Sequence, residues 1–252
     1  YKVALDLGKN PVDLSAIPKL KINRTKIYLL VLDIDETLVH SEIMMDHGVQ
    51  KPTSGKHFDC VLTFPNPNGT QDIIGVRFRP HLHEFLHRMS KIYDLAVYTA
   101  SLGDYMEEVV KILDPEKKIF CAFLHRDHCI KIGNLNIKTM TNFEGEDAII
   151  IDNLIYSFPY QLKQGIPICP FVDDMQDVEL LDLADILEKL PVYGDVFVMI
   201  DDLLGLEEFY SFLGGGEHAS QGVVVRKSVR ASQNNPGSRF SLGRRCGIVG
   251  VP

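Results

Sequence analysis

The sequence has no apolar run that approaches the roughly 18 residues that a membrane-spanning helix needs. It also has no segment with the charged, apolar and small-residue regions of a secretory signal peptide. We therefore expect no membrane span in the printed chain. The start at Tyr1 rather than Met leaves room for a missing N-terminal part with a targeting or anchoring element.

An excess of basic residues is also lacking, since 26 Lys and Arg stand against 34 Asp and Glu, a net charge of −8. A surface that follows nucleic-acid phosphates is usually basic, so we expect no direct nucleic-acid binding. Residues 214–252 are the exception, because their six basic residues and one acid give +5 and leave −13 for the rest. Their Gly, Ser, Asn and Arg content predicts a flexible basic tail, either a solvated linker or a contact for an anionic partner or membrane surface.

The cysteines lack any metal or disulfide spacing. They are five, an odd number, and no two form a C-x-x-C pair. This usage is typical of a reducing compartment, so we expect an intracellular protein, nuclear or cytoplasmic. A zinc site is the weaker interpretation of one cluster, because neighbouring residues point apart in an extended strand. The cluster comprises Cys121, His125, His128 and Cys129.

The most informative stretch present is Val31–Val39. The apolar, β-branched run 27–32 predicts a buried strand, and two aspartates, Asp33 and Asp35, follow it directly. Carboxylates beside a core strand cost several kcal/mol, on the order of 3 or more, unless a cation or hydrogen bonds compensate them. Alone, the pair is equally consistent with a metal site and with a polar turn that caps a helix.

Strands and helices alternate along the rest of the chain, which predicts an α/β protein with a Rossmann-like parallel sheet and helices on both faces. The apolar patterns predict further strands at 94–98, 119–124 and 147–151, an extended segment at 166–169 and a strand at 196–200. They predict helices at 81–91 and 104–113, one capped by Asp173 and Asp174 that runs to about 190, and a last one near 203–212 capped by Asp201 and Asp202.

A β-hairpin is predicted between the first strand and the first helix. The apolar runs 58–64 and 73–78 flank a turn-rich segment in which Asn68-Gly69 is the strongest signal. We therefore divide the chain into an irregular arm (1–25), one α/β domain (26–213) with a hairpin insertion at about 43–78, and the tail (214–252). Core elements fill residues 99–152, so we expect no large cap domain.

Reactive side chains follow three of the predicted strands. Ligands of an open parallel sheet bind at the carboxyl ends of its strands, where Asp33 and Asp35, then Thr99, then Asp152 and Asn153 would meet. Carboxylate, amide and hydroxyl oxygens suit Mg²⁺ with a phosphate group. A carboxylate can attack an anionic phosphoryl group if a cation neutralises the charge, and a second acid can move the proton.

These residues resemble the D-x-D-x-T signature of the haloacid dehalogenase superfamily. The form Asp33-Ile34-Asp35-Glu36-Thr37-Leu38-Val39-His40-Ser41 is similar to that of small phosphatases acting on the RNA polymerase II C-terminal domain and of their Dullard-type relatives. The likeness covers about residues 26–200. It continues through the segments Arg79–Leu86, Tyr98–Ser101, Leu124–Cys129 and Ile151–Asn153.

The resemblance implies a role for each matching residue. Asp33 would be the nucleophile and Asp35 the general acid/base, and Lys138 would orient the phosphate. Thr37 would brace the loop, Thr99 would bind the phosphate and Arg126 would contact the substrate. The implied Mg²⁺ ligands are Asp33, Asp35 through its backbone carbonyl, Asp152 and Asn153, with Asn153 the better direct ligand.

The implied activity is that of a Mg²⁺-dependent phosphoserine/phosphothreonine protein phosphatase with an aspartyl-phosphate intermediate. An uncapped site admits a phosphorylated protein or peptide, with the RNA polymerase II C-terminal domain as a candidate, and we expect a monomer. Two departures concern substrate choice: Leu154-Ile155 stands where the family has Ser-Pro, and Ile43 stands where the nuclear subgroup often has an aromatic residue. The competing hypothesis is a catalytically silent binding module on the same fold, like an import receptor.

Overall fold

The computed structural model describes residues 19–143, 147–192 and 195–204, together with residues 6, 9, 12–14 and 17. The chain forms two compact units, residues 1–181 and 182–252, and each is described by itself. No helix in these ranges is both long enough and apolar enough to cross a membrane.

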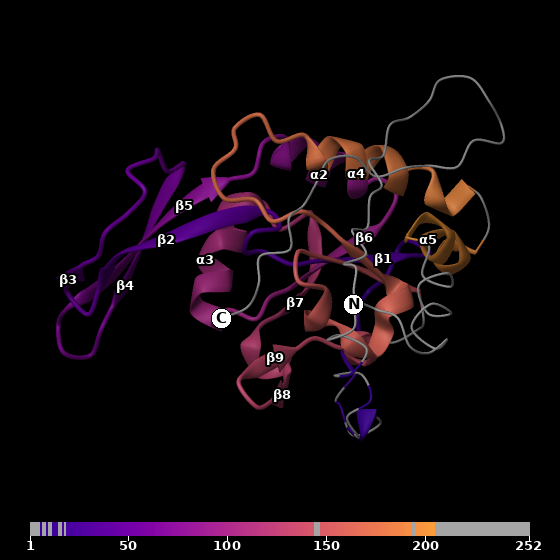
Figure 1. Ribbon diagram of the computed structural model, residues 1–252, viewed down its shortest axis with the longest axis horizontal. Helices are drawn as coiled ribbons and strands as arrows, with labels where there is room; N and C mark the ends of the chain where they lie inside the picture. The colour runs from indigo at the N-terminus through magenta and orange to yellow at the C-terminus, as the bar shows by residue number, and fades with distance from the viewer. Residues whose placement is uncertain are drawn as a thin grey trace, which may run out of the picture. The chain divides into compact units, whose positions relative to one another are not determined.

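A five-stranded parallel sheet forms the centre of the first unit (Figure 1), in the order β11-β10-β1-β6-β7. Its strands are β1 (Leu29–Leu32), β6 (Asp94–Tyr98), β7 (Phe120–Leu124), β10 (Ala148–Asp152) and β11 (Gly165–Pro167). Helices α2 (Leu82–Met89) and α3 (Gly103–Leu113) flank it. The predicted α/β class, with a Rossmann-like parallel sheet flanked by helices, is confirmed.

Strand β1 is apolar at every position because neighbouring strands and the layers on both faces exclude water from it. It pairs with β6 on one side and with β10 on the other. The chain order of the strands therefore reverses at β1. In such sheets the crevice at the carboxyl ends of the strands, next to this reversal, is where ligands bind.

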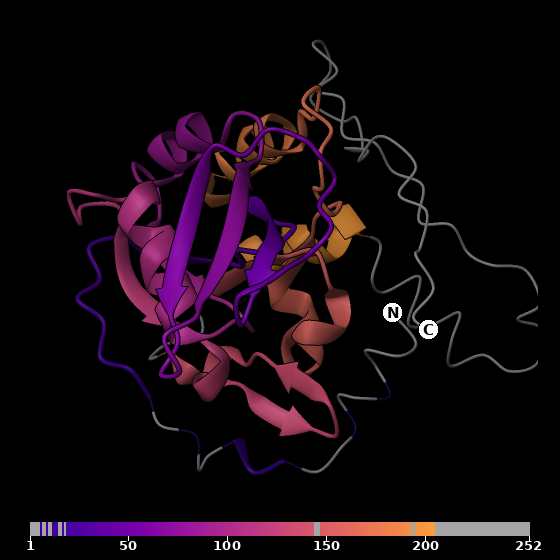
Figure 2. The ribbon, with the colours of Figure 1, turned by 90° about the vertical axis from the view of Figure 1, so that its left-hand side faces the viewer.

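A four-stranded antiparallel sheet follows β1, in the order β3-β2-β5-β4 (Figure 2). Its strands are β2 (Val39–Asp46), β3 (Val49–Gln50), β4 (Cys60–Pro65) and β5 (Gln71–Phe78). The predicted hairpin is β4–β5, and Gly69 has φ 81°, as its turn requires. Sequence patterns missed β2 and β3 because their side chains are mostly polar or half-exposed, so no apolar alternation marks them.

Glycine at position 75 of β5 is required by close packing. A Cβ atom there would lie 2.6 Å from the ring of Phe58, which covers the strand. The Arg77 guanidinium lies over the same ring, 5.1 Å from its centroid. The loop before β4 is thereby packed on one face of the antiparallel sheet.

A two-stranded ribbon, β8 (Ile130–Ile132) and β9 (Leu135–Ile137), lies apart from both sheets (Figure 2). Short 3-10 helices connect the remaining elements. They are η2 (Arg126–His128), η3 (Met140–Asn142), η4 (Ile155–Ser157), η5 (Pro159–Gln164) and, in the second unit, η6 (Leu190–Val192). Between β6 and β10 the described residues, 99–143 and 147–152, contain only core elements and this ribbon, and they form no large cap domain.

Two buried aspartates fasten the ends of the parallel sheet that lie opposite the crevice. Asp94, the first residue of β6, accepts hydrogen bonds from the backbone N–H groups of Thr25 and Lys26 at 2.6 and 2.8 Å. Asp114, which ends α3, accepts from three successive N–H groups that lead into β7. These donors are Lys118, Ile119 and Phe120, at 2.9, 2.8 and 3.1 Å.

The helix predicted to start at Asp173 and Asp174 begins later. It is α4 (Glu179–Leu187), and its cap is Asp177, whose Oδ1 accepts the N–H of Glu179 at 3.0 Å. Asp174 instead accepts the N–H of Gln176 in a turn. The predicted cap was wrong because each of these aspartates can accept a local N–H, and the sequence does not say which turn continues as a helix.

The strand predicted at 196–200 is wrong. This segment is the start of α5 (Val196–Leu204), in the second unit. Asp195 accepts the N–H groups of Phe197 and Val198, and this cap outweighs the β-branched composition. Asp201 and Asp202 consequently lie inside the helix rather than capping another one. The predicted tail, and the predicted helix beyond residue 204, lie outside the described residues.

Candidate active site

The loop after β1 places Asp33 at the crevice. The N–H groups of Thr37, Leu38 and Val39 all donate to the carbonyl oxygen of Ile34, at 3.3, 2.9 and 3.1 Å. Glu36 adopts the left-handed conformation with φ 56°, which lets the chain reverse within a few residues and continue as β2. The Asp33 side chain is buried at the point where this loop leaves the sheet.

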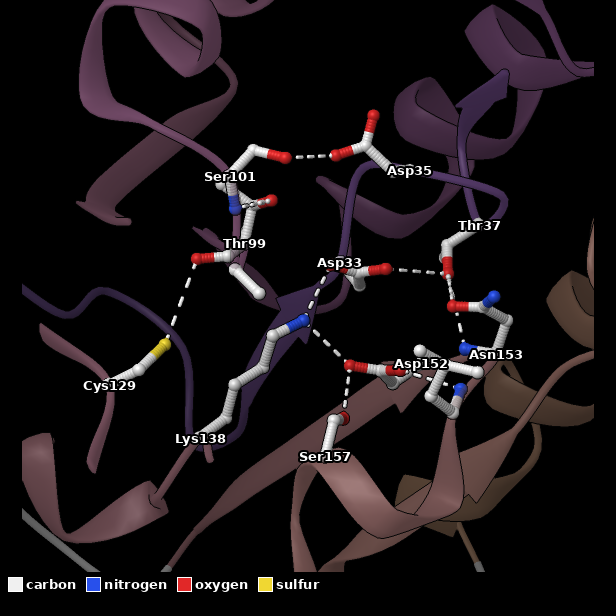
Figure 3. Close-up of polar contacts among 12 residues, drawn as sticks. Asp33, Asp35, Thr37, Thr99, Ser101, Cys129, Lys138, Asp152, Asn153 and Ser157 are labelled. Atoms are coloured by element: carbon white, nitrogen blue, oxygen red, sulfur yellow. Dashed lines mark hydrogen bonds and ion pairs between the residues drawn. The ribbon is translucent and has the colours of Figure 1, made fainter. Parts of the chain in front are cut away.

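Lys138 joins the two strand ends (Figure 3). Its Nζ lies 2.5 Å from Oδ1 of Asp33 and 2.6 Å from Oδ2 of Asp152, and the residue is only 1% exposed. Its backbone N–H donates to the carbonyl oxygen of Ser157 at 2.6 Å, which fixes the chain where β9 ends. The two carboxylates compensate the charge of the buried ammonium, so Lys138 does not behave as a solvated surface lysine.

Burial and charge act in opposite directions on this cluster. Burial raises the pKa of Asp33 to about 7, Lys138 opposes that rise, and the carboxylates of Asp152 and Asp35 add to it. Burial lowers the pKa of Lys138, but Asp152 and Asp33 more than offset this, so the ammonium stays charged. One lysine does not compensate all the carboxylates, and additional positive charge would restore the ionised form of Asp33.

Thr37 connects the loop after β1 to β10. Its Oγ1 donates to Oδ2 of Asp33 at 3.1 Å and accepts the backbone N–H of Asn153 at 3.2 Å. The amide oxygen of Asn153 lies 3.5 Å from the same hydroxyl. The hydroxyl therefore holds Asp33 and Asn153 side by side (Figure 3).

Asp152 is occupied by protein donors on both oxygens. Besides Lys138, its Oδ2 accepts the Ser157 hydroxyl at 2.6 Å, and its Oδ1 accepts the N–H of Leu154 at 2.7 Å. Because these bonds fix the Asp152 carboxylate, it holds the Lys138 ammonium in place. Asn153, whose amide oxygen has a single weak contact, has more capacity to bind a metal.

The Asp35 carboxyl is turned away from Lys138 and toward the loop after β6. Its Oδ2 accepts the Ser101 hydroxyl at 2.5 Å and its Oδ1 accepts the Tyr105 hydroxyl at 2.7 Å. Burial raises the pKa of Asp35, and these two hydroxyls partly lower it again. Since its carboxyl faces away, the predicted metal contact of Asp35 is left to its backbone carbonyl.

Thr99 lies on the loop that carries Ser101, and Arg126, in η2, is bound to that loop. Thr99 directly follows β6, is 1% exposed, and its Oγ1 accepts the N–H of Ser101 at 3.0 Å. Arg126 is tied to this loop, because its Nε donates to the Ala100 carbonyl at 2.8 Å and its N–H donates to the Ser101 carbonyl at 3.0 Å. The structure thus brings together the predicted site residues that follow β1, β6, β9 and β10, with Arg126 joining them from η2, after β7.

Sequence patterns missed the supports of the loop after β1. Arg79 is fully buried, binds both oxygens of Asp177 at 3.0 and 2.8 Å, and donates through Nη1 to the Thr37 carbonyl at 3.1 Å. The N–H of Phe171 donates to the Glu36 carbonyl at 2.8 Å. The Pro80 that follows Arg79 marks a helix start but says nothing of a buried guanidinium, so no local signal was available.

The donor set suits a hard divalent cation such as Mg²⁺. Its atoms are carboxylate and amide oxygens, and one ammonium faces the carboxylates of Asp33 and Asp152 with Asp35 nearby, a surplus of negative charge that Mg²⁺ would compensate. The zinc alternative has no support in the described part of the chain, where the ligand atoms of Cys121, His125, His128 and Cys129 do not converge. Three potential ligands do converge at Asp46, His47 and Asp72, on the antiparallel sheet.

Residues 28–197 match the family model of NLI interacting factor-like phosphatases. The chain belongs to this family. It is 38% identical over 182 residues to CTD small phosphatase-like protein 3 of Caenorhabditis elegans, covering 71% of this chain and 59% of that protein. It is 34% identical to the human CTD small phosphatase-like protein, covering 69% and 60%. The predicted resemblance is therefore confirmed.

Other similarities extend the comparison. Nuclear envelope morphology protein 1 of Schizosaccharomyces pombe is 34% identical to this chain, and the match covers 70% of this chain and 35% of the yeast protein. The solved structure of Fcp1, an essential RNA polymerase II CTD phosphatase, has a TM-score of 0.52 at 20% identity and covers 76% of this chain and 67% of its own, which shows the shared fold. The chain spans about three fifths or less of the relatives named here.

Proposed function

We propose that this family member is a Mg²⁺-dependent phosphoserine/phosphothreonine protein phosphatase that works through an aspartyl-phosphate on Asp33. The observation that carries the proposal is the buried Lys138 ammonium between Asp33 and Asp152, with Thr99 on the neighbouring strand end. A nucleophilic carboxylate, a fixed cation and a phosphate-binding hydroxyl on adjacent strands are what phosphoryl transfer requires.

In the first step an oxygen of Asp33 forms a bond to phosphorus, and the bond from phosphorus to the seryl or threonyl oxygen breaks. The leaving oxygen takes a proton from Asp35, and Lys138 and Thr99 hold the phosphoryl oxygens. In the second step Asp35 takes a proton from water as the water oxygen attacks phosphorus. Inorganic phosphate leaves and the Asp33 carboxylate is restored.

Asp33, the Asp35 backbone carbonyl and Asn153 would hold the Mg²⁺, with Asp152 supporting them through Lys138. When bound, the ion supplies the positive charge that lets an anionic carboxylate approach an anionic phosphoryl group. The charge surplus of the acids supports this assignment.

The substrate we propose is a phosphorylated protein or peptide. This choice is supported by the described residues between β6 and β10, 99–143 and 147–152, which contain no cap domain that would exclude a polypeptide. The names of the relatives point to the RNA polymerase II C-terminal domain as one candidate substrate and to the nucleus as one location. Arg126, attached to the loop that carries Thr99, would contact the peptide.

A catalytically silent binding module is the second candidate. A silent module would not need Asp33, Asp35 and Asp152 for its function. In this structure each of these acids accepts a hydrogen bond from a specific side chain at 2.5 to 3.1 Å. A scaffold without chemistry would have no use for a buried Lys138 between two acids. The arrangement therefore favours the enzyme.

Hydrolysis of an aryl phosphate separates the two candidates. Wild-type protein with Mg²⁺ should turn over, and the rate should vanish with EDTA and return with added Mg²⁺. The exposed variant Glu116→Gln is the matched control and should keep the wild-type rate. Absence of metal-dependent turnover in the folded wild-type protein would favour the silent module.

Beryllofluoride provides a direct test of the nucleophile. As an acyl-phosphate mimic it should attach to Asp33 in the presence of Mg²⁺, and native mass spectrometry of wild type and Asp33→Asn should show the adduct only for wild type. Attachment to another residue would contradict the assignment of Asp33.

A further inference from the structure

Two hydroxyls bind the carboxyl of Asp35 from different elements. Ser101 in the loop after β6 donates to Oδ2 at 2.5 Å, and Tyr105 in the first turns of α3 donates to Oδ1 at 2.7 Å. With one bond on each oxygen, the plane and direction of the carboxyl are fixed. Neither residue follows from the spacing of the acids in the sequence.

Tyr105 is itself held in place. Its ring is buried, and its hydroxyl lies 2.5 Å from the hydroxyl of Ser41 on β2. A tyrosine ring has only two side-chain torsions, so a buried ring with a hydrogen-bonded tip is a rigid support. The Tyr105 side chain thereby connects Ser41 of the antiparallel sheet to the carboxyl of the proposed proton donor.

Ser101 is equally constrained, because its N–H donates to Oγ1 of Thr99. The proposed phosphate-binding hydroxyl and the contacts of the proposed acid thus come from one short segment, 99–105. Figure 3 shows Thr99 and Ser101 of this segment beside Asp35. Proton transfer to a leaving oxygen requires that the acid and the phosphate keep a fixed separation.

We infer that Tyr105, anchored by Ser41, and Ser101 are positioning residues that aim the Asp35 carboxyl at the leaving oxygen of the substrate. The inference rests on the proposed function, in which Asp35 is the proton donor. The hydroxyls of Ser101 and Tyr105 act through the Asp35 carboxyl, and neither is bonded to Asp33.

A pair of substrates tests it, because a seryl oxygen needs a proton to leave whereas nitrophenolate does not. We would measure kcat/KM with Mg²⁺ for a phosphoserine peptide and for para-nitrophenyl phosphate. Asp35→Asn should lose about 100-fold or more on the peptide, the share that general acid catalysis supplies. Tyr105→Phe and Ser101→Ala should each lose about tenfold on the peptide and less than about threefold on the aryl phosphate.

The matched control is Tyr160→Phe, which also removes a tyrosine hydroxyl. That hydroxyl has no hydrogen-bond partner in the described part of the chain, so both rates should stay at the wild-type level. Thermal melting shows whether each variant is folded. If Tyr105→Phe does not fold, Ser101→Ala carries the same test because it removes the bond to the other oxygen.

Equal losses on the two substrates would show a merely structural role and overturn the inference, as would no loss on the peptide. Asp35→Asn distinguishes this failure from a failure of the proposed function. If Asp35→Asn is selective for the peptide and Tyr105→Phe is not, only the inference fails. If Asp35→Asn itself is not selective, the proton-donor role falls and the inference falls with it.

Discussion

Aspartates lie at both ends of the parallel sheet, but their partners differ. At the amino ends, Asp94 and Asp114 are bound chiefly by backbone N–H groups. At the carboxyl ends, Asp33, Asp35 and Asp152 are bound chiefly by side chains: an ammonium and the hydroxyls of threonine, serine and tyrosine.

The kind of partner distinguishes structural acids from reactive ones. A backbone N–H is fixed by the fold, so a carboxylate that it saturates cannot release it without local unfolding. Side-chain donors can rotate and be exchanged for a substrate or a cation. We therefore expect substitutions at the amino ends to affect stability and those at the carboxyl ends to affect turnover.

The largest effect is expected for Asp33→Asn. Removal of the nucleophile should lower kcat by about 10⁴-fold or more, a loss similar to those seen when a nucleophile is removed from other enzymes. Stability should change by less than about 2 kcal/mol, because a buried acid with a raised pKa gives up little when it is neutralised. Steady-state rates and urea unfolding measure the two. A variant that keeps Mg²⁺-dependent turnover would contradict the division between the two ends.

Lys138→Met should combine loss of turnover with a loss of about 3–5 kcal/mol in the free energy of unfolding, because it leaves two buried carboxylates without their cation. The double variant with Asp152→Asn should recover part of that stability and none of the activity. Lys118→Met, at a residue whose side chain is 75% exposed, is the control and should change stability by less than about 1 kcal/mol. Equal stability of the two single variants would mean that Lys138 is not a buried partner.

Asp114→Asn should lower the free energy of unfolding by about 2 kcal/mol, because three N–H groups lose a charged acceptor. The kcat of the folded molecules should stay at the wild-type level. Glu116→Gln, two residues away with a side chain 70% exposed, should be neutral in both respects. A fall in kcat without a fall in stability would place Asp114 with the reactive acids.

A further effect on stability is expected from pH. Burial raises the folded-state pKa of Asp33 from its ordinary 3.8 to about 7, so between these values the folded protein holds a proton that the unfolded chain releases. The stability contributed by this group should therefore fall as pH rises through that interval. Urea unfolding in EDTA should show this slope as a difference between wild type and Asp33→Asn, and Mg²⁺ should reduce it. Parallel curves would mean that Asp33 is ionised throughout.

Strand-end acids were predictable from sequence because a carboxylate that follows an apolar β-run is unusual by itself. That local signal led to Asp33, Asp35 and Asp152, and the topology of the sheet brought them to one edge. Lys138 was different, since it comes from the β8–β9 ribbon and only the family resemblance indicated it before its burial was known.

Supports that act at long range were not predictable. The bonds of Ser101 and Tyr105 to Asp35 depend on where α3 packs, and the bonds of Arg79 depend on Asp177, which lies far along the chain. In the second unit, α5 was mistaken for a strand because a single capping residue, Asp195, outweighed the composition. The periodicity of apolar residues in the sequence indicates which positions are buried. It does not indicate which distant polar group will be the hydrogen-bond partner of a buried side chain.

The bidentate ion pair between Arg79 and Asp177 has a consequence for the synthesis of the chain. Asp33 leaves the ribosome early, yet the carbonyl groups of its loop are held by Arg79 and by the N–H of Phe171. Arg79 in turn requires the Asp177 carboxylate. A nascent chain therefore cannot complete the loop around Asp33 until residue 177 has emerged, so this loop is among the last parts of the first unit to mature.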